Sequence, residues 1–251
     1  MLTFIRRHSP TLSLLMILPL WQLVCVLADV PSYIFPSPSA IFEAFFNVEL
    51  SRWFGHLWAT LYIAILGFII AIGLSIPIAI IMVRSDYLNR TLYPILVVVQ
   101  STPVVAIAPL LIVILGTGDA PRLAITFLIS FFPLVVATTT GLQATPKELI
   151  ELSKSLRAKP SREIWQIRLP FAVPYIFSGL KVAITLAIIG AVIAEFVAAE
   201  KGLGYFIQFS TSYFKIPQAF ASLMLLSVIS LLLFNSIKLI QKTFFAWSIG
   251  K

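Results

Sequence analysis

The sequence predicts an all-α, polytopic membrane protein with six transmembrane helices. Of its 251 residues, 59 % are hydrophobic and only 11 % are charged, whereas an ordinary soluble domain has roughly 25 % charged residues. The mean hydropathy is +1.00. A soluble fold of this size could not bury so much apolar surface, so lipid is the expected solvent. We expect residues 1–251 to form a single transmembrane domain.

Long runs without charged residues mark the expected spans. Each run reaches about 20 residues, the length that crosses the hydrocarbon core of a bilayer. The fifth run is interrupted only by Lys181. The approximate helices expected from these runs are 10–28, 57–83, 92–116, 122–142, 173–198 and 217–239.

The first expected helix follows Arg6 and Arg7, a flank that is also typical of a signal peptide. Its apolar part is longer than a usual signal core and no A-x-A site follows, so we expect an uncleaved helix. A single cysteine, Cys25, excludes a disulfide framework within the chain, and we expect it to pack in the core.

A short amphipathic helix is expected between the first and second spans. Ser37 can cap such a helix with Pro38 in its first position. The apolar residues that would then share one side are Ile41, Phe42, Phe45 and Phe46. The helix would lie either at the outer membrane interface or against the bundle.

The second and third expected spans carry residues with specific consequences. The second contains small residues that let helices approach closely in lipid, namely Gly67, Ala71, Gly73 and Ser75. In the third, Pro103 and Pro109 must disturb the hydrogen bonding, and Gln100 and Thr102 lie just before the first proline. This segment lines a watery pathway, or it is a kinked helix whose polar side chains satisfy its own backbone.

Two charged residues fall inside the fifth expected span. Lys181 lies near its start, so we expect the ammonium group to reach the cytoplasmic interface. Glu195 lies towards the opposite end, where it would face an outer vestibule or mark the end of the span.

The distribution of lysine and arginine predicts the topology. Thirteen of the eighteen fall on one side of the membrane, four fall on the other, and Lys181 lies within a helix. Both termini and the loop 142–172 are therefore expected in the cytoplasm. The positive charge is spread over several loops and does not form one face, so nucleic-acid binding is not expected.

The loop 145–170 is too polar for lipid but has the pattern of two helices. Thr145, Pro146 and Glu148 form a capping-box pattern, which predicts a helix start. A break is expected before Pro160, followed by a second short helix that ends at Pro170 and Pro174. The apolar positions that would share a side are Leu149, Leu152 and Leu156 in the first helix, and Ile164 and Ile167 in the second. Such a loop would dock on a soluble partner or lie on the inner leaflet.

This loop resembles the cytoplasmic coupling motif of binding-protein-dependent ABC importer permeases, which reads E-A-A, three residues, G, nine residues, I-x-L-P. Glu151 begins the motif and Arg157 occupies the glycine position, while Ile167, Leu169 and Pro170 complete it. Other segments are similar to the nitrate, sulfonate and taurine branch, which includes relatives for vitamin precursors. These segments are FPSPSAIF, QSTPVVAIAPLLIV, FFPLVVATTTGL, PYIFSGLKVA, AEF and KGLGYFI.

The chain departs from this motif at three positions. Leu152 and Ser153 replace the two alanines, and Arg157 replaces the glycine that permits the turn between the helices. Arginine there implies either a strained backbone or a corner that has moved to Lys159 and Pro160. We expect the moved corner, because proline already forces a break.

The resemblance implies the fold of a type I ABC importer permease, and a permease subunit that is not itself an enzyme. It implies a second permease subunit, with a homodimer expected, two ATP-binding cassette ATPases docked on the loop 145–170, and an extracytoplasmic solute-binding protein. The location implied is the bacterial cytoplasmic (inner) membrane, and the solute is nitrate, a sulfonate, taurine, or a pyrimidine or vitamin precursor. The implied coupling residues are Glu151, Leu152, Leu156, Arg157, Ile167, Leu169 and Pro170, and the translocation-path candidates are Gln100, Thr102, Pro103 and Glu195.

Other chemistries lack their residues. The sequence has no G-x-x-x-x-G-K-[ST] loop for ATP hydrolysis. His8 and His56 are separated by an expected span, so we expect no metal site and no cofactor. A secondary transporter, the alternative function, should show an inverted repeat with broken helices in both halves, and only the third and fourth spans carry such prolines.

Overall fold

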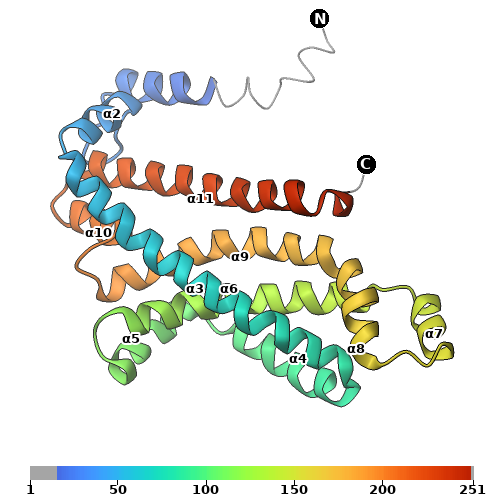
Figure 1. The fold of residues 1–251 in the computed structure, drawn as a ribbon. Coiled ribbons are helices and arrows are strands. Elements are labelled where there is room, and N and C mark those ends of the chain that lie inside the picture. Colours follow the sequence, from blue (N-terminus) through green and yellow to red (C-terminus); the bar gives the residue numbers. More distant parts are fainter. Residues whose placement is uncertain (1–15, 250–251) are drawn as a thin grey trace, which may run out of the picture.

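The computed structural model describes residues 16–249, and within them all regular secondary structure is helical. The all-α prediction is therefore confirmed. In chain order (Figure 1), the elements are the helix Met16–Leu27, α2 Pro38–Phe46, α3 Leu50–Arg84, α4 Asp86–Ser101, α5 Val104–Leu115, α6 Asp119–Gln143, α7 Lys147–Ser155, α8 Pro160–Arg162, the π-helix η1 Glu163–Arg168, α9 Leu169–Ala198, α10 Leu203–Ser212, α11 Ile216–Phe244 and the 3-10 helix η2 Ala246–Ser248.

The centre of the bundle is formed by α6 and α9, which lie side by side, with α3 packed across both. Close approach between α3 and α6 depends on Gly67. A Cβ atom added there would lie 2.6 Å from Cγ2 of Thr126, which is closer than real contacts allow. In lipid, where no hydrophobic force holds helices together, such close packing supplies much of the association energy. The expected role of this small residue is confirmed.

Four of the described helices are long and apolar enough to cross a membrane: α3, α6, the continuous stretch Pro160–Ala198, and α11. The pair α4 and α5 passes the same test together and adds a fifth candidate. The helix Met16–Leu27 is apolar but short, and residues 10–15 of the expected first span lie outside the described residues. Within residues 16–249, the structure thus accounts for up to five of the six expected spans.

The third expected span is broken, which corrects the single helix predicted for 92–116. The axes of α4 and α5 differ by 94° across Thr102 and Pro103. Thr102 has a ψ angle of 126°, outside the helical range, because the ring of the following proline disfavours helical angles in the residue before it. The break lies where Pro103 predicted a disturbance. Pro109 lies inside α5 without ending it.

The short helix α2 begins as predicted, since the Ser37 hydroxyl accepts a hydrogen bond from the Ala40 amide at 3.3 Å. Its four apolar residues are buried to different extents. Ile41 is buried against the bundle, whereas Phe42 and Phe46 are exposed and touch each other. Because α2 packs against α11, it is held by the bundle.

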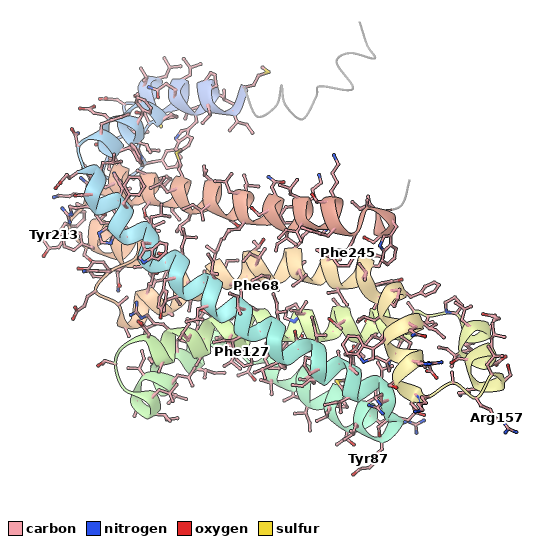
Figure 2. The ribbon with its side chains drawn as sticks, in the orientation of Figure 1. Phe68, Tyr87, Phe127, Arg157, Tyr213 and Phe245 are labelled. Carbon is pink, nitrogen blue, oxygen red and sulfur yellow. The ribbon has the colours of Figure 1, made fainter. Side chains whose placement is uncertain are left out.

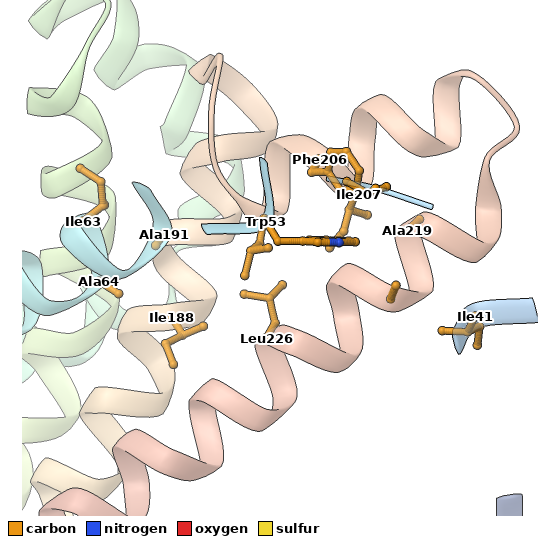
Figure 3. Packing of buried hydrophobic residues seen from close by; sticks show 13 residues of the cluster. Ile41, Trp53, Ile63, Ala64, Ile188, Ala191, Phe206, Ile207, Ala219 and Leu226 are labelled. Atoms are coloured by element: carbon orange, nitrogen blue, oxygen red, sulfur yellow. The ribbon is translucent and has the colours of Figure 1, made fainter. Parts of the chain in front are cut away.

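A cluster around Trp53 joins α2, α3, α9, α10 and α11 at one end of the bundle (Figure 3). The indole of Trp53 stacks on Phe45 and meets the ring of Phe206 edge-on, with centroids 5.2 and 5.0 Å away. Its Nε1 donates to the Phe45 carbonyl at 3.0 Å, so the polar edge of the ring is satisfied. This cluster fixes the position of α10. The cysteine of the first helix, Cys25, is also buried, as expected.

The two ends of the bundle carry different elements. Figure 1 places α7, α8 and the C-terminal end of α11 at one end, and α2 and α10 at the other. The labelled side chains of Tyr87, Arg157 and Phe245 accordingly lie towards the first end, and Tyr213 lies at the second (Figure 2).

Candidate functional site

The first candidate site is the predicted coupling loop, which folds as α7, a corner, and α8 followed by η1. We call residues 145–170 the elbow. Within α7, Ile150 and Ser153 are buried, whereas Leu152, and Leu156 at the C-cap of the helix, are 54 % and 72 % exposed. Exposing two leucines on a charged helix is unfavourable unless another surface covers them.

The corner of the elbow lies at Arg157, which corrects the expectation that it moves to Lys159 and Pro160. Arg157 has a φ angle of +51°, in the left-handed region. Its amide donates to the Lys154 carbonyl at 2.9 Å, and the Ala158 amide donates to the Ser153 carbonyl at 3.0 Å. These two bonds define a Schellman motif, which ends a helix and favours glycine in its left-handed position. The turn satisfies the last carbonyls of α7, so the backbone keeps this corner and a side chain in that conformation costs about 1–2 kcal/mol.

The start of α7 differs from the predicted capping box. Pro146 occupies the cap position and no side chain caps the helix. The Thr145 hydroxyl donates instead to the Leu142 carbonyl at 3.2 Å, because Thr145 directly follows the end of α6. Thr145 therefore closes α6 and does not open α7.

The second half of the elbow continues without a break into α9, so the expected end at Pro170 and Pro174 is wrong. Between Glu163 and Arg168 the helix widens into a π-turn, and the Leu169 amide bonds to the Ile164 carbonyl, five residues back. This wider turn makes room for Pro170, which lacks a donor and would clash with a carbonyl four residues earlier.

A charged contact fastens this turn to the bundle. Nε of Arg168 donates to Oε1 of Glu163 at 2.7 Å, and Nη1 of Arg168 donates to the Leu142 carbonyl at 3.2 Å. Since Leu142 belongs to α6, the elbow is tied to both α6 and α9.

A groove of about 590 Å³ runs between the two halves of the elbow. Four of the seven predicted coupling residues line it: Leu152, Leu156, Arg157 and Ile167. Leu169 and Pro170 are not among the lining residues; they lie in the first turn of α9. Glu151 is also outside the groove and is exposed in the middle of α7, where it caps nothing.

The second candidate site surrounds Glu195, near the end of α9. This side chain is only 1 % exposed, and its Oε2 accepts a hydrogen bond from the Gly204 amide at 2.7 Å. Two residues of α3 hold the preceding amides. The Leu203 amide donates to the Thr60 hydroxyl oxygen at 2.8 Å, and the Gly202 amide donates to Nδ1 of His56 at 3.2 Å.

Three successive amides at the start of α10 are thus held by side chains from two other helices. We call His56, Thr60 and Glu195 the α10 clamp. The first amides of a helix have no partners within it, so these side chains supply what the helix lacks. Ser222 of α11 adds a bond from its hydroxyl to the Leu203 carbonyl at 2.9 Å.

The clamp requires a glycine at position 202. Its φ angle of +134° is a conformation that other residues rarely adopt, and an added Cβ would overlap the Glu195 carboxyl group. Both the backbone angle and the space therefore exclude a side chain there.

Glu195 also lines a cavity of about 730 Å³, together with Arg122 and Lys201. It therefore borders a cavity and also lies near the end of α9, and its place in a translocation path stays a prediction. The other path candidates, Gln100, Thr102 and Pro103, are exposed at the bend between α4 and α5 and do not line this cavity. Within one subunit, the described residues do not bring the four candidates together.

Sequence reasoning missed His56 and Thr60 as partners of the Gly202–Gly204 segment. The contacts span more than 140 residues of chain, and no short motif links them. The available signal was weak: two polar residues four apart at the start of an apolar helix share a face.

Lys181 is partly buried and contacts the C-terminal part of α11, while its expected reach to the cytoplasmic interface stays a prediction. Its Nζ donates to Oε1 of Gln241 in α11 at 3.3 Å. Nε2 of Gln241 in turn donates to the Ser248 hydroxyl at 3.1 Å. This chain of bonds joins α9, α11 and η2.

Comparison with known protein families identifies the family of this chain. The model of a family described as "Binding-protein-dependent transport system inner membrane component" matches residues 71–246, which is more than half of the chain. The chain belongs to this family. The matched range includes the whole elbow and Glu195, while His56 and Thr60 precede it.

Individual relatives agree with the family. A probable ABC transporter permease protein of Haemophilus influenzae is 36 % identical over 98 % of this chain and 99 % of its own length. The formylaminopyrimidine transport permease protein ThiX of Halalkalibacterium halodurans is 33 % identical over 95 % of both chains. Among solved structures, a chain of the inward-facing MetNI methionine ABC transporter aligns with a TM-score of 0.64 at 20 % identity, covering 73 % of this chain and 91 % of that one, and it supports the fold.

The predicted family and function are thus confirmed: the chain is a membrane permease subunit of an ABC importer and not an enzyme. Permeases of this family work with ATPase subunits and a binding protein. The alternative of a secondary transporter without an ATPase is overturned by the family match.

Proposed function

We propose that this permease works as a homodimer in the bacterial cytoplasmic membrane and docks one ATPase on the elbow of each subunit. ATP-driven closure of the two ATPases tips the helices between inward-open and outward-open states. A binding protein delivers the solute to the opposite face. Residues 1–251 form one permease domain, with both termini and the elbow in the cytoplasm.

The elbow carries this proposal. It presents exposed leucines, Leu152 and Leu156, beside a groove at the very end of the bundle. It is also fastened to the helices that would have to move, through the bond from Arg168 to the Leu142 carbonyl and the unbroken helix into α9. A surface that transmits movement from a partner needs both an accessible binding site and a rigid connection to the transmembrane helices.

The sidedness rests on the same geometry. Arg84 and Arg90 flank the start of α4 near Tyr87, which lies towards the same end as Arg157 in Figure 2. Positive residues concentrate on the cytoplasmic side of membrane proteins. This supports the cytoplasmic assignment for the elbow and for the C-terminal end of α11.

The faces of α4 and α5 support a second permease subunit. No residue of α4 is buried, and in α5 only Ala108 is. The exposed Gln100 and Thr102 lie at the bend between these helices, and polar groups at membrane depth need a protein or watery surrounding. A second copy on this face would enclose them, and Pro103 with them, in a shared pathway that also takes in Glu195.

The solute is nitrate, a sulfonate, taurine, or a pyrimidine or vitamin precursor. The full-length similarity to a formylaminopyrimidine transport permease supports the pyrimidine class. Glu151, Leu169 and Pro170 complete the proposed coupling set, with Glu151 contacting the ATPase and the other two fixing the start of α9.

Replacing both exposed leucines tests the docking site. In Leu152→Asp/Leu156→Asp, the apolar contact with the ATPase is lost and two charges must be desolvated, so we expect at least about a tenfold loss of copurified ATPase. The matched control is Ser155→Asp, which adds a carboxylate to the same helix outside the groove. Normal copurification of the double variant, with permease levels in the membrane unchanged, would refute the docking assignment.

A further inference from the structure

Arg157 holds a backbone conformation that disfavours it, and nothing else in the described chain uses its side chain. It occupies the left-handed position of the Schellman turn, where glycine is the unstrained residue. Its guanidinium makes no ion pair or hydrogen bond with any residue in the range 16–249, and the residue is exposed. Strain that is retained at an exposed position points to a function outside the subunit.

The groove beside Arg157 is positively charged. Its lining includes the three cations Arg157, Lys159 and Arg162, and no acidic residue lines it. The nearest described acid in η1, Glu163, is already paired with Arg168. The cations of the groove therefore lack a neutralising partner among its own lining residues.

We propose that Arg157 is a docking residue that pairs with a carboxylate on the ATPase subunit and helps select the cognate ATPase. This inference rests on the proposed docking of the ATPase at the elbow. The leucines supply an apolar contact that any ATPase of the class could make. Arg157 adds a charge that a permease with glycine at this position does not have, so it discriminates between partners by pairing and by repulsion.

The chemistry of the side chain fits this role. A guanidinium group presents several N–H donors in a plane and binds a carboxylate through two parallel hydrogen bonds, which fixes both position and orientation. Adjacent apolar contacts with Leu156 would exclude water and strengthen the pair.

An acidic protein surface suits the position of Arg157 better than lipid headgroups do. Figure 2 shows the Arg157 side chain at the tip of the elbow, pointing away from the bundle. The elbow itself lies beyond the ends of α6 and α9 along their axes (Figure 1), away from the apolar faces that lipid covers. A partner approaching from the cytoplasm reaches Arg157 first.

Charge variants of the assembled transporter test the proposal. We expect Arg157→Glu to raise the Kd between detergent-solubilised permease and its purified ATPase by at least tenfold. Arg157→Gly should raise it several-fold, and Arg157→Lys should fall between glycine and wild type. The matched control is Lys147→Glu, which reverses an exposed charge at the far end of α7, outside the groove, and should change the Kd less than twofold.

Two further readouts identify the partner group. The dependence of Kd on salt should weaken in Arg157→Gly, because one ion pair has been removed. Exposed acidic residues of the ATPase can be replaced one at a time by lysine. One of these ATPase variants should bind the Arg157→Glu permease tightly and the wild-type permease weakly.

The outcomes separate this inference from the proposed function. If Arg157→Gly and Arg157→Glu both bind the ATPase with the wild-type Kd, the proposed role of Arg157 is wrong. If Leu152→Asp/Leu156→Asp loses ATPase binding in the same experiment, the docking site at the elbow is still supported. If the leucine variant also binds normally, the docking site itself is wrong. If the Arg157 variants bind the ATPase normally but bind vesicles of anionic lipid more weakly than the wild-type permease does, Arg157 acts at the membrane surface. That result would also overturn the proposal.

Discussion

Each of the two ends of this permease contains a residue with positive φ, but the surroundings of these two residues differ. At the elbow, Arg157 has a φ of +51° and an exposed side chain. At the start of α10, Gly202 has a φ of +134° and sits against the buried carboxyl of Glu195. One end keeps a side chain where glycine would be easier, and the other permits no side chain at all.

This difference separates internal from external demands on the chain. The three amides at the start of α10 find their acceptors, His56, Thr60 and Glu195, within one subunit. The elbow leaves its leucines and cations exposed, so its geometry becomes complete only with a partner. Changes at the clamp should therefore lower stability, whereas changes at the elbow should alter docking.

Gly202→Ala should give the largest loss of stability. The Cβ atom would overlap the Glu195 carboxyl group, and the backbone angle is one that alanine rarely adopts. We expect the free energy of unfolding, measured by SDS titration in mixed micelles, to fall by about 3 kcal/mol or more. The control is Gly73→Ala, since Gly73 in α3 has open space around its Cα and should tolerate the methyl group. Equal stability of both variants would contradict the clamp geometry.

Glu195→Ala should come next. It leaves the buried Gly204 amide without an acceptor and creates a void, so we expect a loss of about 2 kcal/mol in the same titration. Glu195→Gln keeps an oxygen for the Gly204 amide and should lose about 1 kcal/mol or less. If alanine and glutamine prove equally destabilising, hydrogen bonding to Gly204 is not what Glu195 contributes.

Arg157→Gly should give the smallest effect and the opposite sign. Glycine removes the strain of the left-handed turn but makes the unfolded chain more flexible, so we expect a net gain of about 0.5–1 kcal/mol in the stability of the elbow. Protection of the α7 amides in hydrogen exchange should rise accordingly. Lower protection would show that Arg157 stabilises the corner in the isolated subunit.

The sequence predicted the parts of the fold that depend on local pattern. Apolar runs located up to five candidate spans among the described residues, Pro103 predicted the disturbance of the third one, and Ser37 predicted the start of α2. The resemblance also identified the family, because the coupling motif keeps its spacing despite three substitutions.

Prediction failed where backbone hydrogen bonding in a turn, or a contact between distant segments, decides the structure. Pro170 does not end the second elbow helix because a π-turn absorbs it, and no local pattern announces that turn. Arg157 keeps the corner because two backbone bonds close the turn there, so its side chain does not move the break to Pro160. The partners of the Gly202 and Leu203 amides lie more than 140 residues away in α3, beyond the reach of periodicity.

The continuity of α9 has a mechanical consequence. The helix runs unbroken from Leu169 to Ala198, about 45 Å at 1.5 Å per residue, and carries the elbow at one end and Glu195 near the other. A tilt of α9 imposed at the elbow would therefore displace the loop that follows Ala198. A ligand that immobilises this loop would oppose the tilt. If a ligand bound near Glu195 strengthens binding of a partner at the elbow, then binding of that partner must strengthen ligand binding by the same factor.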